Sequence, residues 1–244
     1  MAEPVLAARG VTVRFGGLIA VDDVEIEVGE RALLGVIGPN GAGKTTLFHA
    51  LSGVLRPNSG RLTVDGDDLT GRPAHVFARH GVARTFQTPR VFREMTAEQN
   101  VRFGLEFAGR ARTHPHDAFD DARSILGFLG LDELAGVPAG ALTPAKQRLL
   151  EIGMALGARP RVLLLDEVAA GLTEAEVDAV SDLIRRVRDE LGLAVIWIEH
   201  AVRAIMSCVE RIVVLHQGRK IADDLPQLVA RDPAVIEAYL GEAE

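Results

Sequence analysis

Cysteine and long apolar runs are scarce in this chain of 244 residues, and each scarcity excludes a class of structure. The single cysteine, Cys208, cannot form an internal disulfide. The longest apolar runs, in VLLLD and AVIWI, fall far short of the roughly 20 residues that span a bilayer, so a membrane role needs other chains. The opening MAEPVLAARG has an acid where a signal peptide needs a basic start and an apolar stretch, which favours a cytoplasmic location.

Clusters of basic residues are also missing. The formal net charge of -7 would repel the phosphates of nucleic acids, so we expect no nucleic acid partner. Apolar residues, in contrast, make up 48% of the chain, enough for a substantial core in one domain or two closely packed ones. We find no internal repeat, low-complexity segment or flexible linker between domains.

Two kinds of strand pattern occur along the chain. Alternating apolar residues over 5–15 and 24–28, with shorter stretches at 61–64 and 81–86, favour an antiparallel layer near the start. ALLGVIG, RVLLLD and AVIWIE are continuously apolar, as expected for strands buried on both faces of a parallel sheet, and each precedes a helical pattern. Between about residues 96 and 156 helical periodicity replaces the strand signal, which predicts a helical insertion in an α/β fold.

The most specific motif is GPNGAGKTT, which satisfies G-x-x-x-x-G-K-[ST] between a predicted buried strand and a helix. These flanking elements disfavour a simple glycine turn that happens to contain a lysine. Backbone N–H groups in such a loop form a nest for the β-phosphate, and the glycines permit its close approach. Lys44 should reach the β- and γ-phosphates, while the hydroxyl of Thr45 should bind magnesium. The predicted nucleotide-binding loop comprises Gly38, Pro39, Asn40, Gly41, Ala42, Gly43, Lys44, Thr45 and Thr46.

Two acids and a histidine follow the next two buried runs. VLLLDE delivers a pair of carboxylates to the carboxyl end of its strand, where open α/β sheets bind their ligands. We expect Asp166 to hold magnesium through its water shell and Glu167 to polarise the attacking water; a solvated acidic turn is the alternative. AVIWIEH ends in His200, whose imidazole would contact the γ-phosphate and orient the carboxylate, unless it is only a helix cap or surface residue.

Taken together, these motifs resemble the ATP-binding subunit of an ABC transporter over nearly all of residues 5–241. The resemblance implies a RecA-like α/β P-loop NTPase core with an N-terminal antiparallel β layer, formed by residues 1–87 and 161–244. It also implies an inserted α-helical subdomain of residues 88–160 that carries the signature motif. ATP and Mg²⁺ are the implied ligands.

The resemblance assigns further roles. Phe15 falls where the family stacks an aromatic ring on adenine, although it could also be a half-buried strand residue. Gln87 falls at the switch glutamine that contacts magnesium and water, which makes Gln87, with Thr45 and Asp166, an implied magnesium ligand. His200 matches the switch histidine, and AGLT occupies the loop that crosses the dimer interface.

ARTFQ, LEIGMAL, AAGLT, IEHAV and DPAVIEAYLG resemble in particular the subunits that power importers of branched-chain amino acids. Importers of urea and short amides share many of these motifs, and an importer of urea, short amides or other amino acids remains an alternative. The implied partners are two integral membrane permease subunits, a solute-binding protein outside the cytoplasm, and a second cassette. That cassette would be a paralogue or, alternatively, a second copy of this chain. The implied location is cytoplasmic, peripheral on the inner face of the plasma membrane.

LTPAKQ departs from the signature L-S-G-G-Q that the family places here. The signature is a helix start that caps the γ-phosphate of an ATP held mainly by the partner subunit. We expect a weakened site, because Pro144 removes an N–H donor and Ala145 adds a methyl group, with backbone strain as well if its φ is positive. Thr143 keeps a hydroxyl and Lys146 adds a positive charge. The residues predicted to contact the ATP of the partner are Thr143, Pro144, Ala145, Lys146 and Gln147.

A second departure is Val168, where the family usually has proline, and we expect it to loosen the following loop. TPRVFREMTAEQNV resembles the docking surface for the permease subunits, with Val91, Phe92 and Met95 either lining that groove or forming core of the helical subdomain.

Other classes of protein fit less well. A P-loop GTPase would carry N-K-x-D, which is absent, and a small-molecule kinase would not combine the acids with Gln87 and His200. A soluble ABC ATPase of DNA repair or translation usually has two cassettes, coiled-coil arms or zinc sites, whereas this chain ends after one cassette. An inactive structural cassette is disfavoured because Lys44, Asp166, Glu167 and His200 are all present.

Overall fold

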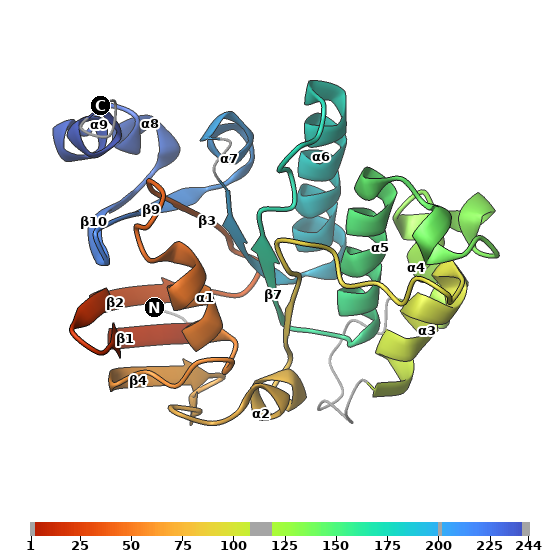
Figure 1. The fold of residues 1–244 in the computed structure, drawn as a ribbon, viewed down its shortest axis with the longest axis horizontal. Coiled ribbons are helices and arrows are strands. Elements are labelled where there is room, and N and C mark those ends of the chain that lie inside the picture. The colour runs from red at the N-terminus through yellow and green to blue at the C-terminus, as the bar shows by residue number, and fades with distance from the viewer. Residues whose placement is uncertain (1–2, 108–118, 200–201, 241–244) are drawn as a thin grey trace.

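The computed structural model describes residues 3–107, 119–199 and 202–240, and it contains two sheets (Figure 1). One is a four-stranded antiparallel sheet at the N-terminal end of the chain, as the alternating patterns predicted. Its strands, in spatial order, are β2 (Leu18–Val28), β1 (Leu6–Phe15), β4 (Ser59–Val64) and β5 (Asp67–Asp68).

The second sheet has six strands and forms the centre of the molecule. Five of them run parallel, and β10 lies antiparallel to β9 at one edge. Every residue of β3, β7 and β8 is buried, which confirms that the three continuous apolar runs form the inner parallel strands. In spatial order the strands are β10 (Arg219–Asp224), β9 (Arg211–His216), β3 (Leu33–Ile37), β8 (Ala194–Ile198), β7 (Val162–Asp166) and β6 (Val82–Arg84).

The prediction for residues 81–86 was wrong in one respect. We expected them to join the antiparallel layer, but β6 pairs in parallel with β7 at the edge of the central sheet. A strand of three residues is too short for its alternation to indicate which sheet it joins.

Helices cover both faces of the central sheet (Figure 1). On one face α1 lies between the two sheets, where Leu47 and Phe48 share a core with Val11 and Ile196. On the other face lie the helices that follow β7 and β8. Outside the inserted helical region, the helices are α1 (Lys44–Leu51), α2 (Ala74–Arg79), α6 (Glu174–Leu191), α7 (Val202–Cys208), α8 (Pro226–Val229) and α9 (Pro233–Leu240).

The inserted helices lie between β6 and β7 in the chain and form one end of the molecule (Figure 1). Gly104 lets two of them approach closely, because a Cβ there would lie 2.3 Å from the carbonyl oxygen of Met154. The division of the chain at residues 88 and 160 stays a prediction. The helices are α3 (Ala97–Phe107), α4 (Ala122–Phe128) and α5 (Pro144–Gly157), with short 3-10 turns at Asp132–Leu134 and Ala139–Ala141.

Among the described residues, none of the helices combines the length and the apolar character that crossing a bilayer requires.

Candidate nucleotide-binding site

The predicted phosphate loop connects the end of β3 to the start of α1 and packs tightly against backbone behind it. Gly38 has φ +151°, and a Cβ there would lie 2.1 Å from the carbonyl oxygen of Leu215. Gly43 has φ +98°, and a Cβ there would lie 2.3 Å from the carbonyl oxygen of Ala20. At Gly41, in contrast, a Cβ would meet nothing within 4 Å, so this part of the loop faces open space. The loop therefore has a fixed back and an open front, which fits the cradle that a phosphate chain needs.

The Lys44 ammonium lies within this loop. Its side chain is buried, and Nζ donates to the carbonyl oxygens of Gly38 at 2.6 Å and Pro39 at 2.9 Å. Thr45 is exposed and Thr46 half-buried at the first turn of α1. The predicted phosphate-binding residues thus form one compact unit at a helix N-terminus.

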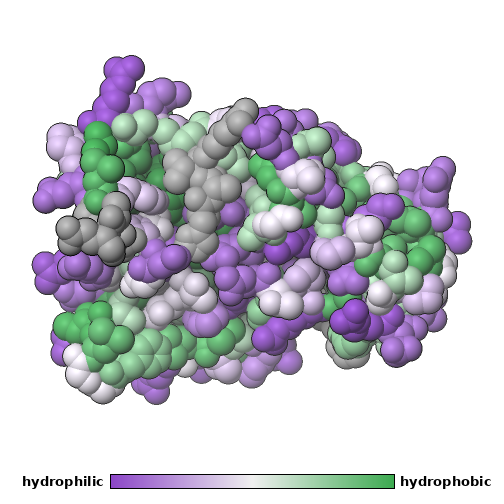
Figure 2. All heavy atoms as spheres, turned by 45° about the horizontal axis from the view of Figure 1, so that its top comes forward, coloured by the Kyte–Doolittle hydropathy of each residue, from purple (hydrophilic) through white to green (hydrophobic). Residues whose placement is uncertain are grey.

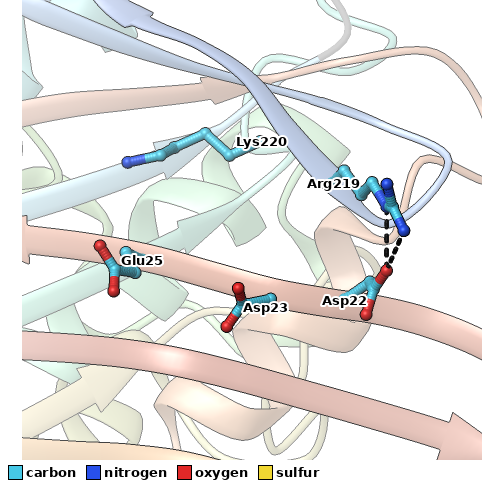
Figure 3. Close-up of a pocket in the computed structure, with 5 residues that line it drawn as sticks. All are labelled: Asp22, Asp23, Glu25, Arg219 and Lys220. Carbon is cyan, nitrogen blue, oxygen red and sulfur yellow. Dashed lines mark hydrogen bonds and ion pairs between the residues drawn. The ribbon is translucent and has the colours of Figure 1, made fainter.

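A charged groove lies between β2 and β10 (Figure 3). Its acids, Asp22, Asp23 and Glu25, lie along β2, while Arg219 and Lys220 come from β10. Arg219 donates to the Asp22 carboxylate at 2.9 Å. In the preceding turn, the N–H of Gly218 donates to the Ala42 carbonyl at 3.0 Å, and the Gly218 carbonyl accepts from the Asp22 N–H. The Gly218 turn therefore joins the phosphate loop to β2 of the antiparallel sheet.

The two predicted acids occupy the carboxyl end of β7, on the same sheet edge as the phosphate loop. Asp166 and Glu167 are both buried, and the side-chain amide of Gln87 donates to Glu167 Oε2 at 2.7 Å. The structure therefore brings together the predicted water-polarising acid and the predicted switch glutamine from positions 80 residues apart. Glu167 has φ +50°, a conformation that costs a non-glycine residue on the order of 1 kcal/mol, and its N–H is held by the Ile198 carbonyl at 3.0 Å.

Arg84 lies next to Asp166, and sequence reasoning missed it. The guanidinium is 3.4 Å from Asp166 Oδ2, donates to Ser52 Oγ at 3.0 Å and lies over the Phe86 ring at 4.6 Å. Burial lowers the pKa of Arg84 from its ordinary value, although the Asp166 carboxylate opposes this shift. Arg84 thus supplies positive charge beside a carboxylate that is predicted to face magnesium.

A buried glutamate on α5 holds the segment that carries Gln87. Glu151 accepts from the N–H groups of Phe86 at 3.3 Å and Arg90 at 2.9 Å, on either side of Gln87. Burial raises the pKa of Glu151, and the two backbone hydrogen bonds oppose this shift. In LEIGMAL this glutamate occupies an otherwise apolar helix face. A charged residue in that position was the sequence signal by which Glu151 could have been identified as a functional residue.

His200 lies outside the described residues. Glu199, which precedes it, is 1% exposed and accepts from the N–H of Ala169 at 2.6 Å and from the indole of Trp197 at 3.3 Å. Ala169 belongs to the loop that we expected Val168 to loosen, and Val168 itself is buried. The Glu199 carboxylate therefore restrains that loop from the end of the neighbouring strand.

The signature segment forms the start of α5. Thr143 is the N-cap and its Oγ1 accepts from the N–H of Lys146 at 3.4 Å, while Pro144 is the first helical residue. Ala145 is not among the residues with positive φ, so the conditional strain does not arise. The Gln147 amide turns back to the carbonyls of Ala139 and Leu142, both at 3.0 Å, an orientation that does not offer it to the ATP of a partner.

Phe15 lies at the tip of the β1–β2 hairpin with 52% of its surface exposed, which disfavours the alternative that it is half-buried. Leu18 and Ile19 are exposed beside it. Figure 2 shows apolar atoms gathered at this hairpin end of the molecule, so an exposed apolar surface that includes an aromatic ring is available for a nucleobase.

A glycine loop around a lysine at a helix N-terminus, with two carboxylates after a parallel strand, places the chain among the α/β P-loop NTPases. The model of the family described as "ABC transporter" matches residues 21–170, and one described as "Branched-chain amino acid ATP-binding cassette transporter" matches residues 219–244. The chain belongs to the ATP-binding proteins of ABC transporters.

Curated relatives match the chain from end to end. The high-affinity branched-chain amino acid transport ATP-binding protein BraF of Pseudomonas aeruginosa is 42% identical over 255 residues, and LivG of Escherichia coli is 39% identical over 256 residues, with 100% of each chain covered in both comparisons. The lipopolysaccharide export system ATP-binding protein LptB of Acidithiobacillus ferridurans is 34% identical, with 97% of each chain covered. The ADP conformation of MJ1267, an ATP-binding cassette of an ABC transporter, is 28% identical with a TM-score of 0.87, covering 99% of this chain and 100% of that one.

Proposed function

We propose that this chain binds and hydrolyses ATP as the cassette subunit of an importer for branched-chain amino acids. The observation that carries the ATPase part is the 2.7 Å contact between Gln87 and Glu167 on the sheet edge that also carries the phosphate loop. It pairs a carboxylate able to polarise the attacking water with a side-chain amide able to contact magnesium and that water. The choice of solute is supported by BraF and LivG and by the match over residues 219–244.

The predicted site residues divide the tasks of binding the nucleotide, activating water and holding magnesium. The N–H groups of residues 38–46 and the Lys44 ammonium hold the phosphates, and Phe15 stacks on the base. Glu167 takes up a proton from the attacking water, and His200 contacts the γ-phosphate and orients the Glu167 carboxylate. Thr45, Asp166 and Gln87 form a set of oxygen donors that suits magnesium. When bound, the ion would neutralise charge on the phosphates.

The proposed assembly contains two permease subunits, a second cassette and a solute-binding protein, and the chain would lie on the inner face of the plasma membrane. LptB shares 34% identity yet is named for lipopolysaccharide export, so general similarity of a cassette does not define its cargo. Uptake of labelled leucine by the reconstituted transporter tests the solute. Uptake of urea or a short amide instead would establish an importer of those solutes. Isolation of the chain in a stable complex that contains no permease subunit would indicate a non-transport ATPase.

Lys44→Ala tests the phosphate site. We expect ATP affinity of the full-length chain to fall at least about tenfold, because a charge contact to the β- and γ-phosphates is lost. Titration calorimetry with ATP measures the change. Lys220→Ala is the matched control, since its ammonium pairs with Asp223 at 2.8 Å and should leave the affinity unchanged. Equal affinities of the wild type and Lys44→Ala would contradict the assignment of the phosphate loop.

The segment of residues 88–101, which we propose docks the permeases, is held by the buried side chain of Asn100. The Asn100 amide donates to the carbonyls of Phe92 at 3.0 Å, Met95 at 3.3 Å and Thr96 at 2.9 Å, and its oxygen accepts from the Phe92 N–H at 2.7 Å. Phe92 and Met95 are 41% and 38% exposed, whereas Val91 packs against the core. This division favours docking for the first two residues and a core role for Val91.

Replacing Phe92 and Met95 together by aspartate should release the chain from permease-containing membranes, because two charges would enter an apolar contact. ATP affinity should stay within about twofold, since the segment lies outside the phosphate loop. Co-sedimentation with membranes that contain the permeases measures the effect. Leu228→Asp on α8, which is 53% exposed, is the control for an exposed apolar residue elsewhere. Full retention of the double variant would show that Phe92 and Met95 serve only the helical subdomain.

A further inference from the structure

Arg148, in the second turn of α5, is the side chain that joins the signature helix to the loop after β7. Its Nη1 donates to the carbonyl oxygen of Glu167 at 2.7 Å, and its Nη2 donates to that of Ala170 at 2.9 Å. A longer contact of 3.4 Å joins Nη1 to the carbonyl of Gln87. Three segments that are distant in sequence therefore converge on one guanidinium.

The backbone around Glu167 is restrained at both ends by these contacts. Its N–H is held by the Ile198 carbonyl and its own carbonyl by Arg148, while φ stays at +50°. Because both peptide groups are fixed, the direction of the Cα–Cβ bond, and hence of the carboxylate, is fixed as well. Removing Arg148 would free one of these peptide groups to relax the strained conformation.

The fork geometry of arginine matters for this arrangement. A guanidinium is planar and presents several N–H donors, so two of its nitrogens can serve two carbonyls at once. A lysine ammonium is a single point charge on a flexible stem and can approach one carbonyl well. Lysine therefore preserves the charge but not the double contact.

The first turn of α5, directly before Arg148, carries the signature. Thr143 caps the helix just over one turn before Arg148. Glu151, about one turn after Arg148 on the same helix, accepts from the N–H groups of Phe86 and Arg90. A helix moves nearly as a rigid body over such a distance. Any displacement of the signature therefore acts on the loop of Glu167 through Arg148 and on the loop of Gln87 through Glu151.

We propose that Arg148 is a positioning residue that makes the orientation of Glu167 depend on the placement of α5. This inference rests on the proposed function. In a dimer of cassettes, the signature of one chain contacts the ATP held by the other, so Arg148 would let the state of the opposite site set the geometry of this chain's own carboxylate. The two ATP sites would thereby be coupled within one polypeptide.

The test compares Arg148→Met with Arg186→Met in the full-length chain. Arg186 is a matched control, because its guanidinium also joins the core to the helical region. It donates to the Phe128 carbonyl at 3.1 Å and lies over the Phe128 ring, so these contacts involve Phe128 and not the loop of Glu167. Amide exchange over residues 167–172 is measured without nucleotide. Exchange should accelerate at least about tenfold in Arg148→Met, as expected when charge-assisted hydrogen bonds are lost, and stay at the wild-type rate in Arg186→Met.

ATP turnover supplies the second readout. In Arg148→Met, kcat should fall at least about tenfold while KM for ATP stays within about twofold, since the carbonyls to which Arg148 donates, those of Gln87, Glu167 and Ala170, lie outside the phosphate loop. Arg148→Lys, a milder change if the methionine variant folds poorly, should recover less than half of the lost rate. Full recovery by lysine would overturn the two-carbonyl arrangement.

The two readouts separate failure of this proposal from failure of the proposed function. If exchange over residues 167–172 is unchanged in Arg148→Met, or rises equally in Arg186→Met, the positioning role is overturned whatever the turnover. If the wild-type chain, alone and with its permeases, hydrolyses no ATP while exchange responds as expected, the contact stands and the ATPase proposal fails.

Discussion

Glu167→Gln is expected to lower ATP hydrolysis at least about a hundredfold while ATP affinity changes less than about twofold. Glutamine has nearly the shape of glutamate, and its amide oxygen can still accept from the Gln87 amide at the 2.7 Å position. What it lacks is the basic oxygen that takes a proton from the attacking water. The phosphate loop is untouched, so ATP should bind and hold two cassettes closed. Turnover of the assembled transporter and calorimetry of the isolated chain measure the two quantities.

Glu190→Gln is the matched control for this experiment. Glu190 is exposed near the end of α6, and in the part of the chain that the structure describes its carboxylate accepts from Arg186 of the same helix. Its turnover should equal that of the wild type. Hydrolysis by Glu167→Gln near the wild-type rate would remove Glu167 from its proposed role and would leave the buried acid with a structural task only.

The parts of the site that the sequence predicted are those encoded in contiguous residues. GPNGAGKTT and VLLLDE each combine a buried strand with the polar residues that follow it, so the sheet edge that carries both could be inferred from the pattern. The contact between Gln87 and Glu167 spans 80 positions, and it was reached through the family resemblance and not from spacing.

The residues that sequence reasoning missed act through tertiary contacts. Arg84, Arg148, Glu151 and Glu199 are ordinary charged residues in their local sequence, and the contacts by which they reach the site join residues 19 to 82 positions apart. No periodic pattern identifies such partners, because periodicity reports only which face of an element is buried. A charged residue among apolar neighbours was the only available signal.

The same limit applies to backbone conformation. The positive φ of Glu167 accompanies hydrogen bonds to Ile198 and Arg148, and the string LLLDEV reveals neither. The conditional strain at Ala145 likewise depended on a dihedral angle that composition cannot supply, and the structure removes it. At Gln147 the sequence offered an amide for a partner's ATP, but the amide is used to close the preceding turn.

The structure changes the reason for expecting a weak signature. An anion at a helix start is bound by the first few N–H groups, which have no partner within the helix. In α5 the first of these is absent at Pro144, and the N–H of Lys146 already faces the Thr143 hydroxyl at 3.4 Å. The N–H of Ala145 is then the principal donor left in the first turn. The weakness comes from lost donors and an added methyl group, and strain plays no part.

We therefore expect the chain to work beside a different cassette in an asymmetric dimer. Its own phosphate loop and acids should hydrolyse ATP quickly when a partner supplies an intact signature, whereas the site completed by LTPAKQ should turn over slowly. Loss of one donor to a transition state typically costs about a hundredfold or more in rate, so a homodimer with two such signatures should be a poor ATPase.

Rewriting LTPAKQ as LSGGQQ, through Thr143→Ser, Pro144→Gly, Ala145→Gly and Lys146→Gln, should raise the turnover of the homodimer at least about tenfold, because two glycines restore the N–H donor and the close approach. Helix α9 offers the matched control, since it also opens with proline and alanine at an exposed end, and Pro233→Gly with Ala234→Gly should leave turnover unchanged. ATP turnover is compared for the chain alone, for the chain with a paralogous cassette, and for both altered chains. A homodimer that already matches the heterodimer and gains nothing from the rewrite would show that Thr143 and Lys146 suffice to cap the γ-phosphate, because the hydroxyl and the ammonium would then replace the missing glycine contacts.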